Sequence, residues 1–195
     1  MQNNIETVQD KNREEKLRKL LNLIDPQEGR MGCDAIDNKN RKYELKSMTK
    51  NSCTTSRDVG LHTIQKWRTR HWIIGKGKNL KNGFVFEEIY YVSKKNMEEW
   101  YLSIENKIKP DLDLLKKITQ ILKKNKKITK LNIERLDYLI KRGYTLNNPK
   151  IPLDYIKKKG TLLKEPYDAS LIESVKLSWN DSCLLFFSIL MCLFW

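Results

Sequence analysis

Residues 32–46, GCDAIDNKNRKYELK, are the stretch of the chain that best predicts its fold. Two short stretches suited to β-strands flank Asn38-Lys39-Asn40, which is a polar turn of the kind that closes β-hairpins. We therefore predict an antiparallel hairpin that turns at Lys39. The chemistry that this hairpin can support depends on which side chains it brings to one face.

The register of the hairpin determines which acidic residues lie together. A turn at Lys39 pairs Asp34 with Glu44, and their Cβ atoms would then lie about 5 Å apart on a shared face. Lys46 is two residues beyond Glu44 and projects from the same face, whereas Asp37 has the opposite parity. A slip of one residue would exchange the two faces.

Two carboxylates and an ammonium on one face form a candidate catalytic site. The charges of Asp34 and Glu44 repel each other unless a cation neutralises them, and a hard divalent ion bound through oxygen does so. We expect Mg²⁺ as the cofactor, with Lys46 offsetting negative charge on an attacked phosphate. The alternative is an ordinary hairpin whose acids and lysine form a ladder of surface salt bridges.

The chain is strongly basic, and its positive charge is concentrated in two blocks. Thirty-eight Lys and Arg residues against 24 Asp and Glu give the 195 residues a formal net charge of +14. Residues 30–82 hold 13 basic and 4 acidic side chains, and residues 107–160 hold 16 and 5. Such an excess favours nucleic acid as the partner, with an anionic membrane surface as the competitor. For the second block, solvated helix faces explain the charge equally well.

The remaining sequence predicts a mixed α/β domain, in which a small mixed sheet is flanked by helices. With 39% apolar and 32% charged residues, the chain is neither disordered throughout nor fibrous. We expect Ser93 to begin a helix, Pro110 to open another, and residues 75–83 to form a loop. Helical spacing marks 11–24, 57–70, 94–108, 111–125 and 133–142, strand-forming residues mark 71–75 and 84–92, and 146–156 is expected to be extended.

Hydroxyl and guanidinium side chains follow the hairpin. Guanidinium groups suit bidentate contacts to guanine edges or phosphates, and hydroxyls suit phosphate oxygens. The predicted DNA-contacting residues are Thr54, Thr55, Ser56, Arg57, Arg68 and Arg70. His71 is better explained as a packed structural histidine than as a general base.

Together these features resemble the PD-(D/E)xK nuclease superfamily and, within it, the type II restriction endonucleases. The resemblance lies in GCDAID and YELKSMT, in TTSRDVGLHTIQKWRTRHWII and more loosely in NPKIPLDYI, and it covers about residues 28–156. It implies a restriction-endonuclease-like core with Asp34 and Glu44 as metal ligands and Lys46 as the catalytic lysine. The name of the motif has proline directly before the aspartate, and this chain has Cys33 at that position. The resemblance also implies a further acid from the N-terminal helix, either Glu14 or Glu15.

By this resemblance the protein is a Mg²⁺-dependent, site-specific endonuclease that hydrolyses double-stranded DNA. Cutting both strands requires two active sites, so a symmetric homodimer is expected. The resemblance also implies a cognate DNA methyltransferase in the same system. Two alternatives stay open: a structure-specific nuclease such as a junction resolvase, and a non-catalytic or inactive DNA-binding protein of the same fold.

We expect a nuclease domain over residues 1–160 and an appendage over 161–195. The appendage ends in the apolar run 183–195, which is too short for a membrane span and which we expect to be dispensable. A core segment, a dimer contact or a shifted reading frame would also explain it. The cysteines at 33, 53, 183 and 192 form no CxxC pair, and we expect reduced thiols in a cytoplasmic protein.

Overall fold

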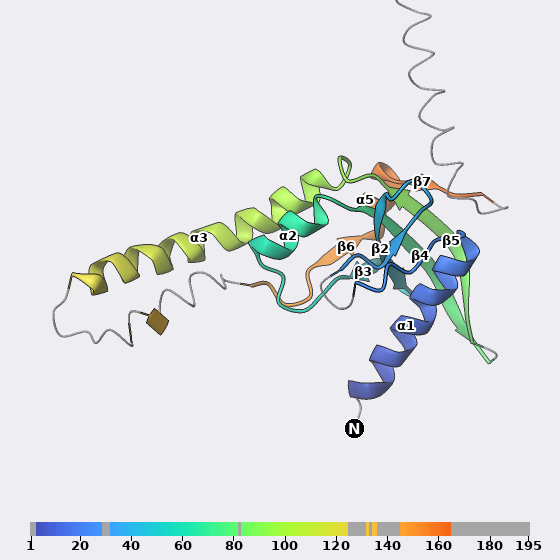
Figure 1. The fold of residues 1–195 in the computed structure, drawn as a ribbon, viewed down its shortest axis with the longest axis horizontal. Coiled ribbons are helices and arrows are strands. Elements are labelled where there is room, and N and C mark those ends of the chain that lie inside the picture. Colours follow the sequence, from blue (N-terminus) through green and yellow to red (C-terminus); the bar gives the residue numbers. More distant parts are fainter. Residues whose placement is uncertain are drawn as a thin grey trace, which may run out of the picture.

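The computed structural model describes residues 3–28, 32–81, 83–124, 132, 134, 135 and 145–164. A mixed five-stranded sheet with the order β1-β2-β4-β5-β7 forms its centre, and a two-stranded sheet, β3-β6, lies beside it (Figure 1). Strands β2 and β4 are parallel, and the other neighbours in the large sheet are antiparallel. The strands are β1 (Ala35–Ile36), β2 (Lys42–Met48), β3 (Ser52–Thr54), β4 (His71–Leu80), β5 (Gly83–Val92), β6 (Lys150–Pro152) and β7 (Thr161–Leu162).

Helices cover both faces of the large sheet, which confirms the predicted fold class. Helix α1 (Asn3–Leu20) lies on one side, whereas α2 (Leu61–Trp67), α3 (Glu98–Lys123) and α5 (Leu153–Lys159) pack on the other. Alternation along the strands divides the apolar residues between two cores. The core under α1 contains Leu17, Leu21, Tyr43, Leu45, Ile73 and Ile89, and the opposite core contains Ile64, Trp67, Trp72, Ile74, Tyr101 and Ile156.

The hairpin over residues 32–46 forms in the predicted register. Ala35 pairs with Tyr43 and Ile36 pairs with Lys42. The backbone N–H of Asp34 donates to the Tyr43 carbonyl at 3.0 Å. Because β1 has only two residues, it leaves the edge of β2 open next to Asp34, and this opening positions the site described below.

The turn of the hairpin is held by the other aspartate. The Asp37 carboxylate accepts hydrogen bonds from the backbone N–H groups of Lys39 and Arg41 and from the Tyr43 hydroxyl. Asn40 adopts the left-handed conformation, with φ of 61°, which asparagine tolerates better than most residues. Asp37 therefore lies on the opposite face from Asp34, as predicted, and has a structural role.

The expected loop over residues 75–83 is wrong, because β4 continues to Leu80 and pairs with β5. Two of the glycines that suggest a loop, Gly75 and Gly77, are instead points of close approach within a strand. A Cβ atom on Gly75 would lie 2.3 Å from the Phe86 ring, and one on Gly77 would lie 2.0 Å from the Val85 carbonyl oxygen. The aromatic rings of β5 occupy the space that side chains at these positions would need.

Several helix boundaries also differ from the prediction. Helix α1 ends at Leu20, and Ile24 instead forms an isolated bridge with Ile36. Helix α3 runs unbroken through Pro110, which is exposed, so water can bond the carbonyl that proline leaves without a donor. Ser93 does not cap α3 but accepts a hydrogen bond from Asn96 in the preceding turn. The other differences are that α2 is shorter than 57–70 and that 146–156 contains both β6 and the start of α5.

The sheet extends slightly past the expected domain boundary at residue 160. Thr161 and Leu162 form β7 and pair with β5. The apolar run 183–195, both C-terminal cysteines and most of the helix expected over 133–142 lie outside the described residues. Within the described part, Cys33 and Cys53 are buried and are not joined to each other by a disulfide. No helix there has both the length and the apolar character of a membrane span.

Candidate active site

Three carboxyl groups surround the ammonium of Lys46. Its Nζ atom lies 3.1 Å from Oε1 of Glu44, 3.3 Å from Oδ2 of Asp34 and 3.5 Å from Oε1 of Glu14. The same atom donates to the backbone carbonyl of Leu45 at 2.7 Å. The structure therefore brings together Asp34, Glu44 and Lys46, the three residues expected to form the catalytic site.

The open edge of β2 places Asp34 in this cluster. Where β1 ends, the backbone N–H of Leu45 has no strand partner from β1, and the Asp34 carboxylate accepts its hydrogen bond at 2.8 Å. The lysine bonds the same oxygen of Asp34. One carboxylate thus completes the strand edge and faces Lys46, so the local fold fixes its position.

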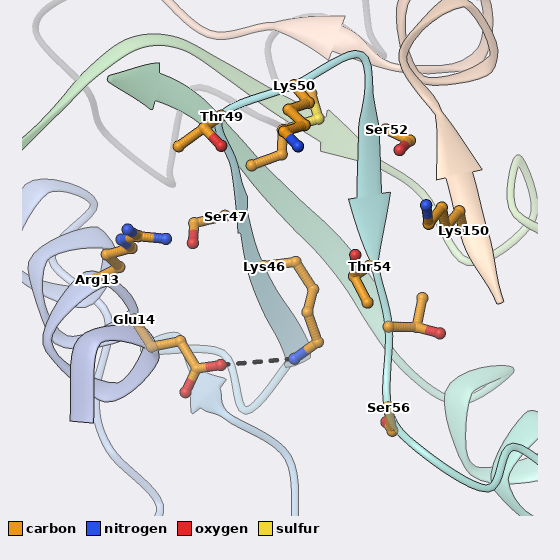
Figure 2. Close-up of a pocket in the computed structure, with 12 residues that line it drawn as sticks. Arg13, Glu14, Lys46, Ser47, Thr49, Lys50, Ser52, Thr54, Ser56 and Lys150 are labelled. Atoms are coloured by element: carbon orange, nitrogen blue, oxygen red, sulfur yellow. Dashed lines mark ion pairs between the residues drawn. The ribbon is translucent and has the colours of Figure 1, made fainter. Parts of the chain in front are cut away.

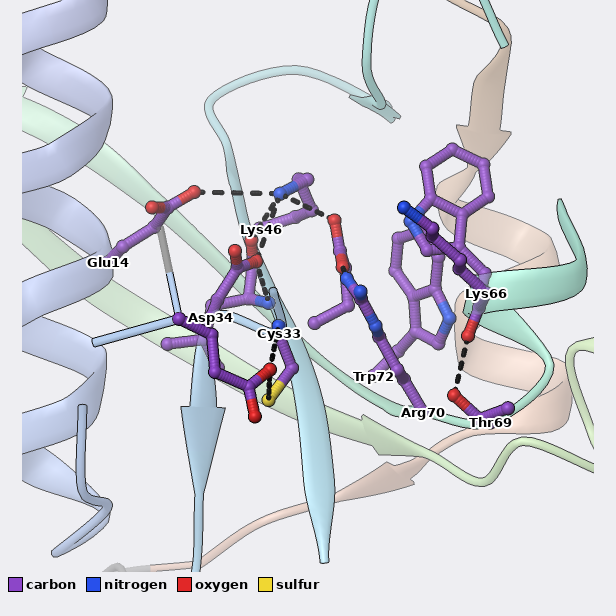
Figure 3. Close-up of polar contacts among 12 residues, drawn as sticks. Glu14, Cys33, Asp34, Lys46, Lys66, Thr69, Arg70 and Trp72 are labelled. Carbon is purple, nitrogen blue, oxygen red and sulfur yellow. Dashed lines mark hydrogen bonds and ion pairs between the residues drawn. The ribbon is translucent and has the colours of Figure 1, made fainter. Parts of the chain in front are cut away.

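Helix α1 contributes the third carboxyl group, and the structure distinguishes the two candidates that the sequence left open. Glu14 faces Lys46, and Figure 3 shows it reaching the site from the side of α1. Glu15 is exposed and pairs instead with Lys19 on its own helix, at 2.7 Å. Only the rotation of α1 about its axis separates these neighbours, and that rotation is set by burial of Leu17 and Leu21.

Burial and mutual repulsion perturb the ionisation of this cluster. Burial of the Glu14 carboxyl, reinforced by the charges of Asp34 and Glu44, raises its pKa to about 7 despite the nearby Lys46. For Lys46, burial acts against the charged form, but Glu44, Asp34 and Glu14 outweigh it and hold its pKa well above the ordinary value. Lys46 is therefore a fixed positive charge at neutral pH, and Glu14 titrates there.

The donor set of the site suits a hard divalent cation. Asp34 and Glu44 present carboxylate oxygens to one common cation, Lys46, so their oxygens converge. Among the described residues no group of three or more His, Cys, Asp or Glu side chains is arranged to hold a metal. Two carboxylates are nevertheless sufficient for Mg²⁺, which is usually held by one or two of them and takes its other ligands from water and substrate phosphate.

The cluster opens into a polar pocket of about 630 Å³ (Figure 2). Three of the predicted DNA-contacting residues, Thr54, Thr55 and Ser56, line it, and Thr55 also donates to the Pro149 carbonyl at 2.7 Å. Basic and hydroxyl side chains that the sequence did not single out complete the lining. These are Arg13, Ser47, Thr49, Lys50, Ser52 and Lys150. Met48 and the two cluster residues Glu14 and Lys46 also line the pocket.

The three predicted DNA-contacting arginines have different surroundings. Arg57 is exposed and directly follows the pocket residue Ser56. Arg68 joins α2 to α3 through Glu98, at 2.7 Å, and Glu105, at 2.6 Å. Arg70 is buried next to the cluster, as described below.

His71 lies apart from the pocket lining. Its ring stacks on that of Tyr91, whose hydroxyl is 2.6 Å from Nδ1 of the histidine. This packing agrees with the structural role expected for His71.

One family model matches most of the chain. The family model described as restriction endonuclease PvuII matches residues 1–129, which is well over half of the 195 residues. The matched range includes α1, the hairpin with Asp34, Glu44 and Lys46, and strands β3 to β5. The chain therefore belongs to the PvuII restriction endonuclease family.

Proposed function

We propose that Asp34, Glu44 and Lys46 carry out the hydrolysis of DNA in this chain, with Mg²⁺ as the cofactor. Membership of the family makes the protein a site-specific endonuclease that hydrolyses DNA. The observation that supports the residue assignment is the convergence of Asp34 and Glu44 on Lys46 at the wall of a polar pocket. A surface ladder of salt bridges would not gather the buried Glu44 and the half-buried Asp34 around one lysine.

Each side chain has a role that follows from its position. Asp34 and Glu44 would hold Mg²⁺, which when bound activates water and offsets phosphate charge. Lys46 keeps its proton, so its ammonium can stabilise negative charge that develops on the phosphate. Glu14 has a pKa in the range where a carboxyl group exchanges protons near neutral pH.

The pocket lining would hold the DNA backbone. Lys50, Lys150 and Arg13 supply positive charge around the site, and the hydroxyls of Thr54 and Ser56 suit phosphate oxygens. Arg57 would extend this contact surface from its exposed position. The pairing of β3 with β6 places Lys150 opposite Thr54, so one strand pair presents both a cation and a hydroxyl.

A homodimer is proposed because each chain carries one such cluster and a duplex has two strands to cut. A cognate DNA methyltransferase is proposed as the partner activity that would protect the host sequence. Sedimentation of the purified chain with and without duplex DNA tests the first proposal. A monomer that cuts both strands at one site would contradict it.

The central experiment is digestion of plasmid DNA with and without Mg²⁺, followed by sequencing of the ends. We expect cutting at one short sequence only when Mg²⁺ is present, and none by Asp34→Asn. Lys42→Ala is the matched control, because Lys42 lies on the same strand but is exposed and pairs with Glu28. Binding without cutting, or cutting of branched DNA regardless of sequence, would contradict the proposal.

A further inference from the structure

Arg70 is a buried cation at the edge of the candidate active site. It follows α2 and immediately precedes β4, where its backbone N–H donates to the Trp67 carbonyl at 2.9 Å. Its side chain enters the site from the side opposite to Glu14 (Figure 3). Nη1 lies 2.7 Å from Oε2 of Glu44, and the two residues are only 8% and 4% exposed.

The two oxygens of Glu44 have different partners. Oε2 bonds Arg70, whereas Oε1 lies 3.1 Å from Nζ of Lys46. A carboxylate held at both oxygens has a fixed plane, and a guanidinium is a rigid planar donor suited to holding it. The contact therefore determines which oxygen of Glu44 faces Lys46 and Asp34.

Stability alone is a weak reason for such a contact. Two buried charges lose their hydration, and this loss offsets most of their attraction. A contact to DNA is also a weak explanation, because Arg70 is almost inaccessible and is bonded to Glu44. The parallel pairing of β2 and β4, with Tyr43 beside His71, keeps Arg70 close to Glu44 in the folded chain.

We propose that Arg70 is a positioning residue for Glu44. It holds Oε2 so that Oε1 is presented to the space beside Asp34 and Lys46. This inference rests on the proposed function, in which Glu44 is a metal ligand. It also revises the role expected for Arg70 from the sequence, which was contact with DNA.

The sign of the effect on Mg²⁺ binding separates positioning from simple charge balance. If Arg70 only neutralised charge, removing it would strengthen Mg²⁺ binding, because a repelling cation would be lost. If Arg70 orients Glu44, its loss leaves the carboxylate free to rotate, and Mg²⁺ binding does not strengthen. Calorimetric titration of the DNA-free protein with Mg²⁺ measures this sign independently of activity.

The experiment compares the wild type with Arg70→Met, Arg70→Lys and the control Arg41→Met. Arg41 lies in the same hairpin as Glu44, but it pairs with Asp37 on the other face of the hairpin, away from the pocket. We expect Arg70→Met to lower kcat at saturating Mg²⁺ at least tenfold. The KM for a duplex that contains the cleavage site found by end sequencing should change less than threefold. Arg70→Lys should recover most of kcat, since an ammonium can still bond Oε2. Arg41→Met should keep the wild-type kcat and Mg²⁺ affinity.

Three results would overturn the proposal: kcat within twofold of wild type in folded Arg70→Met, a raised KM with unchanged kcat, or tighter Mg²⁺ binding.

If a melting curve shows that Arg70→Met is unfolded, Arg70→Gln is used in its place, because its neutral amide can still donate to Glu44. Arg70→Gln should then show a partial loss of kcat, and its full activity with tighter Mg²⁺ binding would contradict positioning. Failure of the proposed function is distinguishable, because Lys46→Ala or omission of Mg²⁺ would then leave wild-type cutting intact.

Discussion

The carboxyl group of Glu14 lies 3.5 Å from the ammonium of Lys46, and this contact joins α1 to β2. Burial and two neighbouring carboxylates raise the pKa of Glu14 from 4.5 to about 7. The folded state therefore binds this proton more tightly than the unfolded state does. The stabilisation is complete below about pH 4.5 and is lost as the pH rises through 7.

We expect Glu14→Gln to flatten this part of the stability profile. Between pH 5 and pH 8 the free energy of unfolding of the wild type should fall by on the order of 1–3 kcal/mol relative to that of Glu14→Gln. This range already allows for the partial exposure of the Glu14 carboxyl group, which weakens the effect. Urea unfolding of the metal-free protein at the two pH values measures the difference. Glu15→Gln is the control, because Glu15 is exposed and pairs with Lys19. Parallel profiles for wild type and Glu14→Gln would contradict the prediction.

Lys46→Ala should remove cleavage while leaving DNA binding in place. In the proposed function the ammonium acts on charge that develops during the reaction, and losing one such preorganised group costs roughly 10²–10³ in rate. Single-turnover cleavage and a gel-shift assay on the same duplex separate the two effects. A cutting rate equal to that of wild type or of Lys42→Ala would show that the active site lies elsewhere.

The hairpin and the convergence of Asp34, Glu44 and Lys46 could be predicted because the relevant rules are local. The polar turn around Lys39 sets the register, and strand parity then separates Asp37 from Asp34, Glu44 and Lys46. The structure agrees in both respects. No contact distant in sequence is needed for this part of the argument.

Other features depend on contacts between distant segments and could not be predicted. The choice of Glu14 over Glu15 depends on how α1 packs on the sheet. Lys150 enters the pocket only because β6 pairs with β3. A guanidinium such as Arg70 suits a DNA phosphate and a buried carboxylate equally well, so sequence alone does not separate the two roles.

The basic pocket residues should make DNA binding strongly dependent on salt. Each phosphate neutralised contributes about −0.9 to the slope of log affinity against log salt concentration. Lys50→Ala and Lys150→Ala should each make that slope shallower by about one unit. Lys19→Ala, which removes an exposed lysine paired with Glu15, should not. Fluorescence anisotropy over a range of NaCl concentrations measures the slopes, and unchanged slopes in both pocket variants would exclude these contacts.

The core between the sheet and α3 contains a buried hydrogen-bond relay centred on Tyr101. Its hydroxyl accepts from Trp72 Nε1 at 2.6 Å and donates to the Trp67 carbonyl at 3.1 Å. Tyr101→Phe keeps the ring but leaves a buried indole N–H without this acceptor, which costs about 1–3 kcal/mol. The control Ser103→Ala removes a hydroxyl bonded only within its own helix, to the Trp100 carbonyl. It should change the free energy of unfolding by no more than about 0.5 kcal/mol. Urea unfolding at a single pH compares the two, and equal stabilities of wild type and Tyr101→Phe would show that the relay does not stabilise the fold.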